Sequence, residues 1–279
     1  MKLRFLGTGA AEGVPALWCT CGHCQAARQE RGRSIRLRSA LLIDDRLLVD
    51  CGPDLIAATA WHGLDLSGVR TLLITHEHDD HLDLLNLEVR SEGFCATPLP
   101  NLHVYGSAGA MALIRGSHLS EDQMRLRTHV VGAFDNWETD GYRFAALRAK
   151  HGSPSMEPLL YAIADALGTA VLYAHDTGPF PEETWAYLAN PLVGSRWAFD
   201  VVSLDATNGV LDHIGESHMS VAQVVEHRRR LAVAGLLKPG ARVLANHFSH
   251  AGAPAHSQLA ARLLTLGIEP THDGLTVEA

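Results

Sequence analysis

Three histidines and a carboxylate lie within six residues of one another in the segment 75–81. They are His76, His78, Asp80 and His81. His76 and His78 are two positions apart, so in an extended turn both can point to one metal ion. Asp80 and His81 follow one step later and can reach a second ion. Groups of this kind are costly to bury unless a cation satisfies them. The segment therefore predicts a metal site.

The residues on either side predict how this segment is held. The apolar run 71–74 is short enough to be a buried strand, and the leucines between Leu82 and Val89 indicate a helix that begins at about His81. The ligand-rich segment then follows the carboxyl end of a strand, where open α/β sheets place their functional residues.

Further candidate ligands follow other predicted strands. His151 comes after the run 142–150, Asp176 after 170–174 and His247 after 243–246. Asp176 can bridge two ions, because a carboxylate can give one oxygen to each. Asp50 ends the run 46–49, and its position favours orienting a ligand histidine over binding the metal itself.

A second group of possible metal ligands lies near the N-terminus. Cys19, Cys21 and Cys24 place three thiols within six residues, which in a cytosolic chain favours zinc over disulfides. A tetrahedral site needs a fourth ligand. His23 lies between the thiols and could hardly turn back onto the same ion, so a distant histidine is expected. Reduced cysteines in a turn are the alternative.

A basic patch follows the cysteines, with Arg31, Arg33, Arg36 and Arg38 in the segment 28–38. A solvated helix end and loop is the favoured interpretation, and phosphate contact is the alternative.

The composition restricts the class of protein. A chain of 279 residues with 47% hydrophobic residues can form one large α/β domain or two small ones. The net charge of −8, from 23 basic and 31 acidic residues, argues against a broad nucleic-acid surface. No apolar run approaches the roughly 20 residues that span a bilayer, and the first residues do not read as a signal peptide. We therefore expect a cytoplasmic location and no membrane partner.

The pattern His-x-His-x-Asp-His after an apolar strand resembles the signature of the metallo-β-lactamase superfamily. Asp50-Cys51-Gly52 is similar to the Asp-x-Gly strand end of that family. The resemblance implies an α/β fold, an αββα sandwich with its site along one edge. It covers residues 1–279 as a single domain, with a small zinc-binding insertion at about 15–38.

The resemblance also implies a ligand set with two complete metal sites. The implied ligands are His76, His78 and His151 for the first ion, Asp80, His81 and His247 for the second, and Asp176 as the bridge. A set with aspartate at the bridging position is similar to the phosphodiesterase branch, which includes tRNase Z and PhnP-like enzymes. In that branch Asp80 and His218 would be catalytic, with His218 assisting the leaving group. From the residues alone, His218 is a loop histidine that caps the following helix.

The cysteine insertion is similar to that of PhnP-like and PqqB-like members of the family. There the structural zinc takes a histidine three residues after the last active-site histidine. In this chain that position is His250, three residues beyond His247.

The resemblance implies hydrolysis of a small cyclic or nucleotide-type phosphodiester by a hydroxide held between two divalent ions. Manganese or zinc is expected in this site and zinc in the structural one. Two alternatives remain: a thioester or lactone hydrolase of the same fold, and a PqqB-like biosynthetic metal-binding protein. The expected partner is a small-molecule substrate rather than nucleic acid, and homodimers are common among relatives.

Overall fold

The strands form two seven-stranded sheets in the computed structural model, which describes residues 1–190, 197–211 and 215–279. In spatial order, the first sheet consists of β14 (Thr276–Glu278), β1 (Lys2–Gly7), β2 (Ala40–Ile43), β3 (Leu47–Val49), β4 (Thr71–Leu73), β5 (Leu102–Gly106) and β6 (Leu126–Val130). The second consists of β13 (Glu269–Pro270), β12 (Leu237–Asn246), β11 (Phe199–Asp205), β10 (Ala170–Ala174), β9 (Leu159–Asp165), β8 (Tyr142–Arg148) and β7 (Asn136–Thr139).

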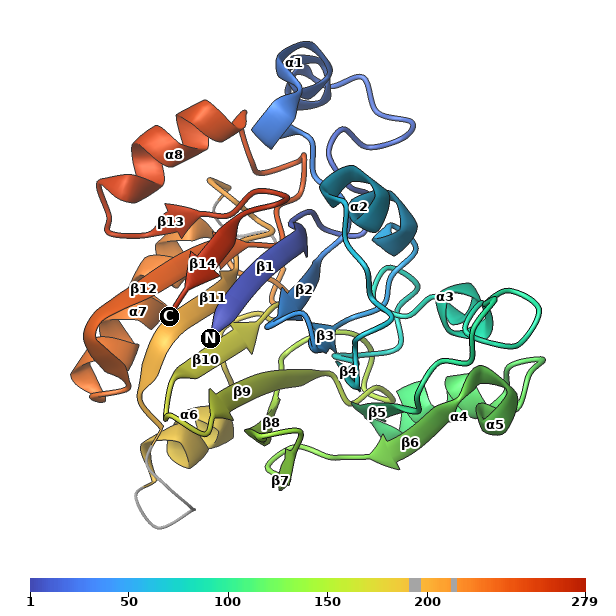
Figure 1. The fold of residues 1–279 in the computed structure, drawn as a ribbon. Coiled ribbons are helices and arrows are strands. Elements are labelled where there is room, and N and C mark those ends of the chain that lie inside the picture. Colours follow the sequence, from blue (N-terminus) through green and yellow to red (C-terminus); the bar gives the residue numbers. More distant parts are fainter. Residues whose placement is uncertain (191–196, 212–214) are drawn as a thin grey trace.

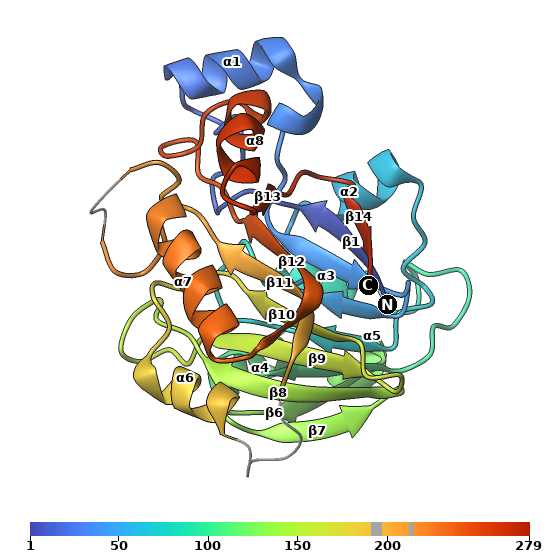
Figure 2. The same ribbon diagram turned by 90° about the vertical axis from the view of Figure 1, so that its left-hand side faces the viewer.

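The helices lie outside the two sheets, as Figures 1 and 2 show. They are α1 (Gly22–Glu30), the short 3-10 helix η1 (Gly32–Ser34), α2 (Leu55–His62), α3 (Leu84–Glu88), α4 (Ala108–Arg115), α5 (Glu121–Met124), α6 (Glu182–Ala189), α7 (Val221–Val233) and α8 (His256–Leu264). In both views α1, at the top, projects beyond the ends of the sheets. None of the helices in the described ranges has the length and apolar character that a membrane crossing requires.

Alternating apolar side chains explain the layered arrangement. In β1, Leu3 and Phe5 pack between the sheets, whereas Leu6 faces the outer layer with α2 and α4. In β10, Tyr173 faces the space between the sheets and Leu172 packs under the helices of the other side. Strands buried on both faces need two covering layers. Two sheets between helical layers confirm the predicted αββα sandwich.

Parallel strands bring the candidate ligands to one edge. β3, β4, β5 and β6 run parallel in the first sheet, and β10, β11 and β12 run parallel in the second. The segments after β4, β10 and β12 contain the predicted histidine and aspartate ligands except His151, which follows the antiparallel strand β8. Gly9, after β1, bridges to Phe248, which ties the first sheet to the loop that carries His247.

The helix after the histidine cluster begins later than the sequence predicts. We expected it to begin at about His81, but α3 begins at Leu84. Leu82 instead forms an isolated bridge with Cys51, and Asp83 caps the helix by accepting a hydrogen bond from the Leu85 amide. The prediction was wrong because this pairing keeps Asp80 and His81 in the turn before the helix. The pairing also fixes the segment 75–81 to the end of β3.

Candidate metal centre

The first cluster joins three imidazoles from two loops. His76 Nε2 lies 2.9 Å from His78 Nδ1, and His151 Nε2 lies 3.3 Å from the same His78 atom. His76 and His78 follow β4, while His151 follows β8 in the other sheet. Ring nitrogens converging at this spacing suit ligands of one ion. Burial and the neighbouring His81 hold the pKa of His76 well below its usual range, so its ring is neutral as a ligand must be.

The second cluster consists of Asp80, His81, Asp176 and His247. His81 Nε2 lies 3.1 Å from Asp80 Oδ2 and in close contact with Asp176 Oδ2. His247 Nε2 lies 3.1 Å from the same Asp176 oxygen. The four residues come from the ends of β4, β10 and β12, so both sheets contribute to the cluster.

Asp176 lies between the two clusters. Its Oδ2 is 3.8 Å from His76 Nε2, and its Oδ1 is 3.9 Å from His151 Nε2. Asp176 and His247 both have positive φ values, of 50° and 59°, a strained conformation for these residues that is common at functional sites. Burial would raise the pKa of Asp176, but His247 and His81 outweigh it and hold that pKa well below the usual range.

Hydrogen bonds on the far side of each ring fix the ligand nitrogens. Asp50 Oδ2 lies 2.7 Å from His81 Nδ1, and the Thr75 amide donates to the other Asp50 oxygen. Thr207 Oγ1 lies 2.8 Å from His247 Nδ1 in the same way. A partner on Nδ1 leaves Nε2 free to bind a metal.

The buried atoms of the second cluster show that these residues fit divalent cations. His81 Nε2 and His247 Nε2 are buried against Asp176 Oδ2, and neither makes a hydrogen bond with the residues that the structure describes, which is costly unless another group satisfies them. Burial lowers the pKa of His81, but the negative charges of Asp50, Asp176 and Asp80 outweigh burial and raise it well above its usual range. The carboxylates around the buried His81 imidazole concentrate negative charge, which bound cations would neutralise.

His218 lies at the edge of both clusters. Its ring centroid is 4.9 Å from that of His151 and 5.9 Å from that of His247. His218 Nδ1 is 3.0 Å from Asp205 Oδ2. Burial lowers the pKa of His218, but the hydrogen bond and charge of Asp205 outweigh burial and raise it to about 9. His218 is therefore protonated at neutral pH, and 26% of its side chain is exposed.

Asp205 is a site residue to which sequence reasoning assigned no role. It is fully buried at the end of β11, and it accepts hydrogen bonds from the amides of Thr207 and Met219. The available signal was a carboxylate directly after a buried strand, the same signal that identified Asp50 and Asp176. His175 turns away from the ligands, because its Nε2 lies 2.8 Å from Ser203 Oγ in β11.

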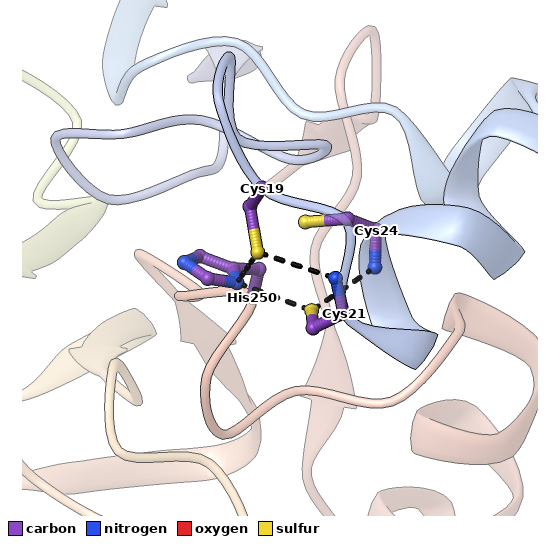
Figure 3. Close-up of side chains that lie close together, drawn as sticks. All are labelled: Cys19, Cys21, Cys24 and His250. Atoms are coloured by element: carbon purple, nitrogen blue, oxygen red, sulfur yellow. Dashed lines mark hydrogen bonds between the residues drawn. The ribbon is translucent and has the colours of Figure 1, made fainter.

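The three cysteines gather around one imidazole at the base of α1, as Figure 3 shows. Cys19 Sγ and Cys21 Sγ lie 3.5 Å and 3.4 Å from His250 Nδ1, and Cys24 completes the group. Amide and imidazole hydrogen bonds lower the pKa of Cys21 to about 6, which favours the thiolate that zinc binds. His23 contacts the His250 backbone oxygen and lies outside the group. Three thiols and one imidazole fit a structural zinc site.

Glu12 is a second residue without a predicted role. Its Oε1 lies 3.8 Å from His250 Nε2 and 2.5 Å from Ser249 Oγ, so it contacts the loop between the two metal groups. No spacing rule points to it, because it is distant in sequence from both partners.

Residues 45–248 match the sequence profile of the beta-lactamase superfamily domain, and the chain belongs to that family. The predicted family is thereby confirmed, and the chain has the metallo-β-lactamase fold with clusters of residues that can hold metal ions. The match includes both clusters of the metal centre, whereas the cysteines lie before it.

Two characterised proteins are similar in sequence. Ribonuclease Z of Mycobacterium avium (strain 104) is 27% identical over 211 residues, which are 68% of this chain and 73% of that protein. An octanoyltransferase of Porphyromonas gingivalis (strain ATCC BAA-308 / W83) is 37% identical over 86 residues, 29% of this chain. The chain spans only 16% of that octanoyltransferase.

Two solved structures share the whole fold. A diphosphatase from the PhnP family has a TM-score of 0.75 at 21% identity, covering 99% of this chain and 96% of its own. Zinc-bound PqqB from Methylobacterium extorquens has a TM-score of 0.73 at 18% identity and covers all of both chains.

Proposed function

We propose that this protein hydrolyses a small phosphodiester of the cyclic or nucleotide type. The observation that carries the proposal is the pair formed by His218 and Asp205 beside both metal clusters, with Nδ1 and Oδ2 3.0 Å apart. A protonated imidazole next to a metal centre can give its proton to a departing alkoxide, which is a poor leaving group without one. A thioester releases a thiolate, a good leaving group that does not require this donor.

Two divalent ions, manganese or zinc, are proposed for the metal centre. His76, His78 and His151 would hold one and Asp80, His81 and His247 the other, with Asp176 shared between them. Such a pair supplies a nucleophile from water at neutral pH and neutralises the charge on the phosphoryl oxygens. One zinc ion is proposed for Cys19, Cys21, Cys24 and His250.

The protein residues have separate roles in this proposal. Asp50 and Thr207 hold the imidazoles of His81 and His247 in the orientation that presents Nε2. Asp205 fixes His218 through Nδ1, so that Nε2 donates the proton to the leaving oxygen. Asp80 acts beside them as a ligand of the second ion.

The relatives support phosphorus chemistry. One fold neighbour is described as a diphosphatase of the PhnP family, and one sequence relative is a ribonuclease Z. The acidic balance of the chain favours a small substrate over a polynucleotide.

The manganese-loaded protein should be assayed against bis-p-nitrophenyl phosphate, a p-nitrophenyl carboxylic ester and a thioester. We expect turnover of the phosphodiester by the wild type. His218→Ala should lose about 10²-fold or more toward a 2′,3′-cyclic nucleotide, whose leaving group is an alkoxide, and less toward bis-p-nitrophenyl phosphate, whose p-nitrophenolate leaves without a proton. Turnover of the ester or thioester alone would refute the proposal in favour of a thioester or lactone hydrolase. No turnover of any substrate would favour a PqqB-like metal-binding protein.

A further inference from the structure

A large cavity lies away from the metal centre, between the N-terminal insertion, the end of α2 and the segment before β14. Its volume is about 760 Å³, which is in the range of small-molecule sites. It shares no lining residue with either metal cluster. The lining residues are Arg28, Arg31, Gly32, Arg33, Ile35, Trp61, His62, His272 and Asp273.

The cavity carries positive charge that neighbouring carboxylates do not neutralise. Within the described ranges, the side chains of Arg31 and Arg33 make no hydrogen bond or ion pair, and both residues are exposed. Arg28 donates to the backbone oxygens of Cys19 and Ala16, at 2.8 and 3.1 Å. The adjacent Glu30 accepts from Ser34 Oγ rather than from an arginine. In a chain of net charge −8, three such arginines at one cavity are an exception to the general surface.

Asp273 is the one carboxylate among these lining residues, and its oxygens already have partners. It accepts hydrogen bonds of 2.6 Å from Thr8 Oγ1 and from the Leu37 amide. Burial raises the pKa of Asp273 to about 7, so the carboxyl group is only about half ionised near neutral pH. Because both oxygens of Asp273 have other partners, the guanidinium groups of Arg31 and Arg33 remain available to an anion.

A planar surface and a buried imidazole complete the lining. Trp61, in the last turn of α2, is 64% exposed, although an indole ring normally packs in the interior. The neighbouring His62 has a buried Nε2 with no hydrogen-bond partner among the residues that the structure describes. His62 packs against Gly274, where an added Cβ would lie 2.6 Å from its ring. An exposed ring next to uncompensated arginines suits a ligand with both an aromatic and an anionic part.

We propose that this cavity binds an organic phosphate that carries a planar ring, of which a nucleoside monophosphate is the simplest example. Guanidinium groups match the geometry of phosphate oxygens and bind them through paired charge-assisted hydrogen bonds. Arg31 and Arg33 hold the phosphate, and Trp61 stacks on the ring. The site is separate from the metal centre and does not depend on which ester that centre hydrolyses.

The test is calorimetric titration of the full-length, metal-loaded protein with adenosine monophosphate, inorganic phosphate and adenosine. Arg31→Ala/Arg33→Ala removes the phosphate-binding side chains, and Trp61→Ala removes the stacking surface. The matched control is Arg127→Ala/Arg229→Ala, which removes the same charge from two exposed, ion-paired arginines elsewhere. Binding is measured instead of turnover, so the outcome is independent of the proposed hydrolysis.

We expect adenosine monophosphate to bind more tightly than either phosphate or adenosine. Its affinity should fall about tenfold or more in Arg31→Ala/Arg33→Ala and stay within about twofold in the control pair. Trp61→Ala should remove the preference for adenosine monophosphate over phosphate. Saturable binding that Arg31→Ala/Arg33→Ala leaves unchanged would place the ligand at the metal centre and overturn the proposal, as would the absence of binding.

Discussion

His218 Nδ1 and Asp205 Oδ2 form a hydrogen bond of 3.0 Å at the point where the two metal clusters meet the solvent. The histidine comes from the loop before α7 and the aspartate from the end of β11. Since Asp205 is fully buried and accepts hydrogen bonds from the amides of Thr177, Thr207 and Met219, it is held in place before any substrate arrives.

The pair predicts the pH dependence of catalysis. The raised pKa of His218, about 9, keeps its proton on the ring at neutral pH. The rate should therefore fall as pH rises through about 9, because the proton donor is lost. Asp205→Asn removes the negative charge that raises this pKa, so the fall in rate should move to lower pH. The measurement is kcat against pH for both proteins.

Two controls make this pH prediction sharp. The His218→Ala variant should have a low kcat that does not fall with rising pH in this range. If kcat falls at the same pH in the wild type and in Asp205→Asn, another group is responsible for the pH dependence. Metal content must be measured in every variant, because Asp205 also lies 3.8 Å from His247 Nδ1.

The cysteine group predicts a metal that supports folding. Cys21→Ser or His250→Ala should lose about one equivalent of zinc per chain and lower the melting temperature, because binding of a structural metal contributes to folding free energy. Cys95→Ser is the matched control, since Cys95 is a free cysteine outside the group. Unchanged zinc content in both Cys21→Ser and His250→Ala would remove the structural zinc from the account.

Close packing at Gly52 joins the end of β3 to the segment 75–81, and this contact leads to a further prediction. A Cβ at Gly52 would lie 1.9 Å from the Asp80 backbone oxygen, and backbone cannot yield as a side-chain tip can. Gly52→Ala should cost about 1–3 kcal/mol of unfolding free energy and reduce metal content, because it displaces Asp80. Gly68→Ala is the control, since its nearest contact would be an ordinary 3.6 Å. Equal metal content and stability in the two variants would contradict the link.

The raised pKa of Asp273 leads us to predict that the free energy of unfolding depends on pH. Its pKa is about 7 in the folded protein against 3.8 as the usual value, so the folded state binds the extra proton between these values. Stability should be highest below about pH 4 for this group and fall as pH rises through about 7, by about 1.4 kcal/mol per unit of pKa difference. Denaturant unfolding of Asp273→Asn should show a flatter profile over that range. Parallel profiles for the two proteins would contradict this assignment.

The sequence predicted the architecture and the set of residues that gather at the metal centre. Ligands such as Asp176 and His247 stand directly after short apolar runs, and parallel strands bring such positions to one edge. The family resemblance added His250, because no spacing rule connects it to the cysteines. The predicted start of α3 was wrong because the pairing of Leu82 with Cys51 joins segments far apart in the chain.

Residues that act through tertiary packing could not be predicted. Asp205 directly follows a buried strand in the sequence, but its role is visible only beside His218, and Glu12 is recognisable only beside His250. The cavity lined by Arg31, Trp61 and His272 is assembled from three segments whose proximity no local pattern encodes. From the sequence alone, segment 28–38 is interpreted as a solvated helix end and loop, because nothing in it indicates that Trp61 lines the same cavity.

The most direct test of the central claim is hydrolysis of a 2′,3′-cyclic nucleotide, followed by phosphorus NMR with manganese-loaded wild-type protein and with Asp176→Asn. We predict conversion of the cyclic diester signal to a monoester signal by the wild type. The Asp176→Asn variant should be slower by about 10²-fold or more, since it loses the carboxylate between the two clusters. A diester signal that persists with the fully loaded wild type, while a carboxylic ester or thioester is hydrolysed, would contradict the account.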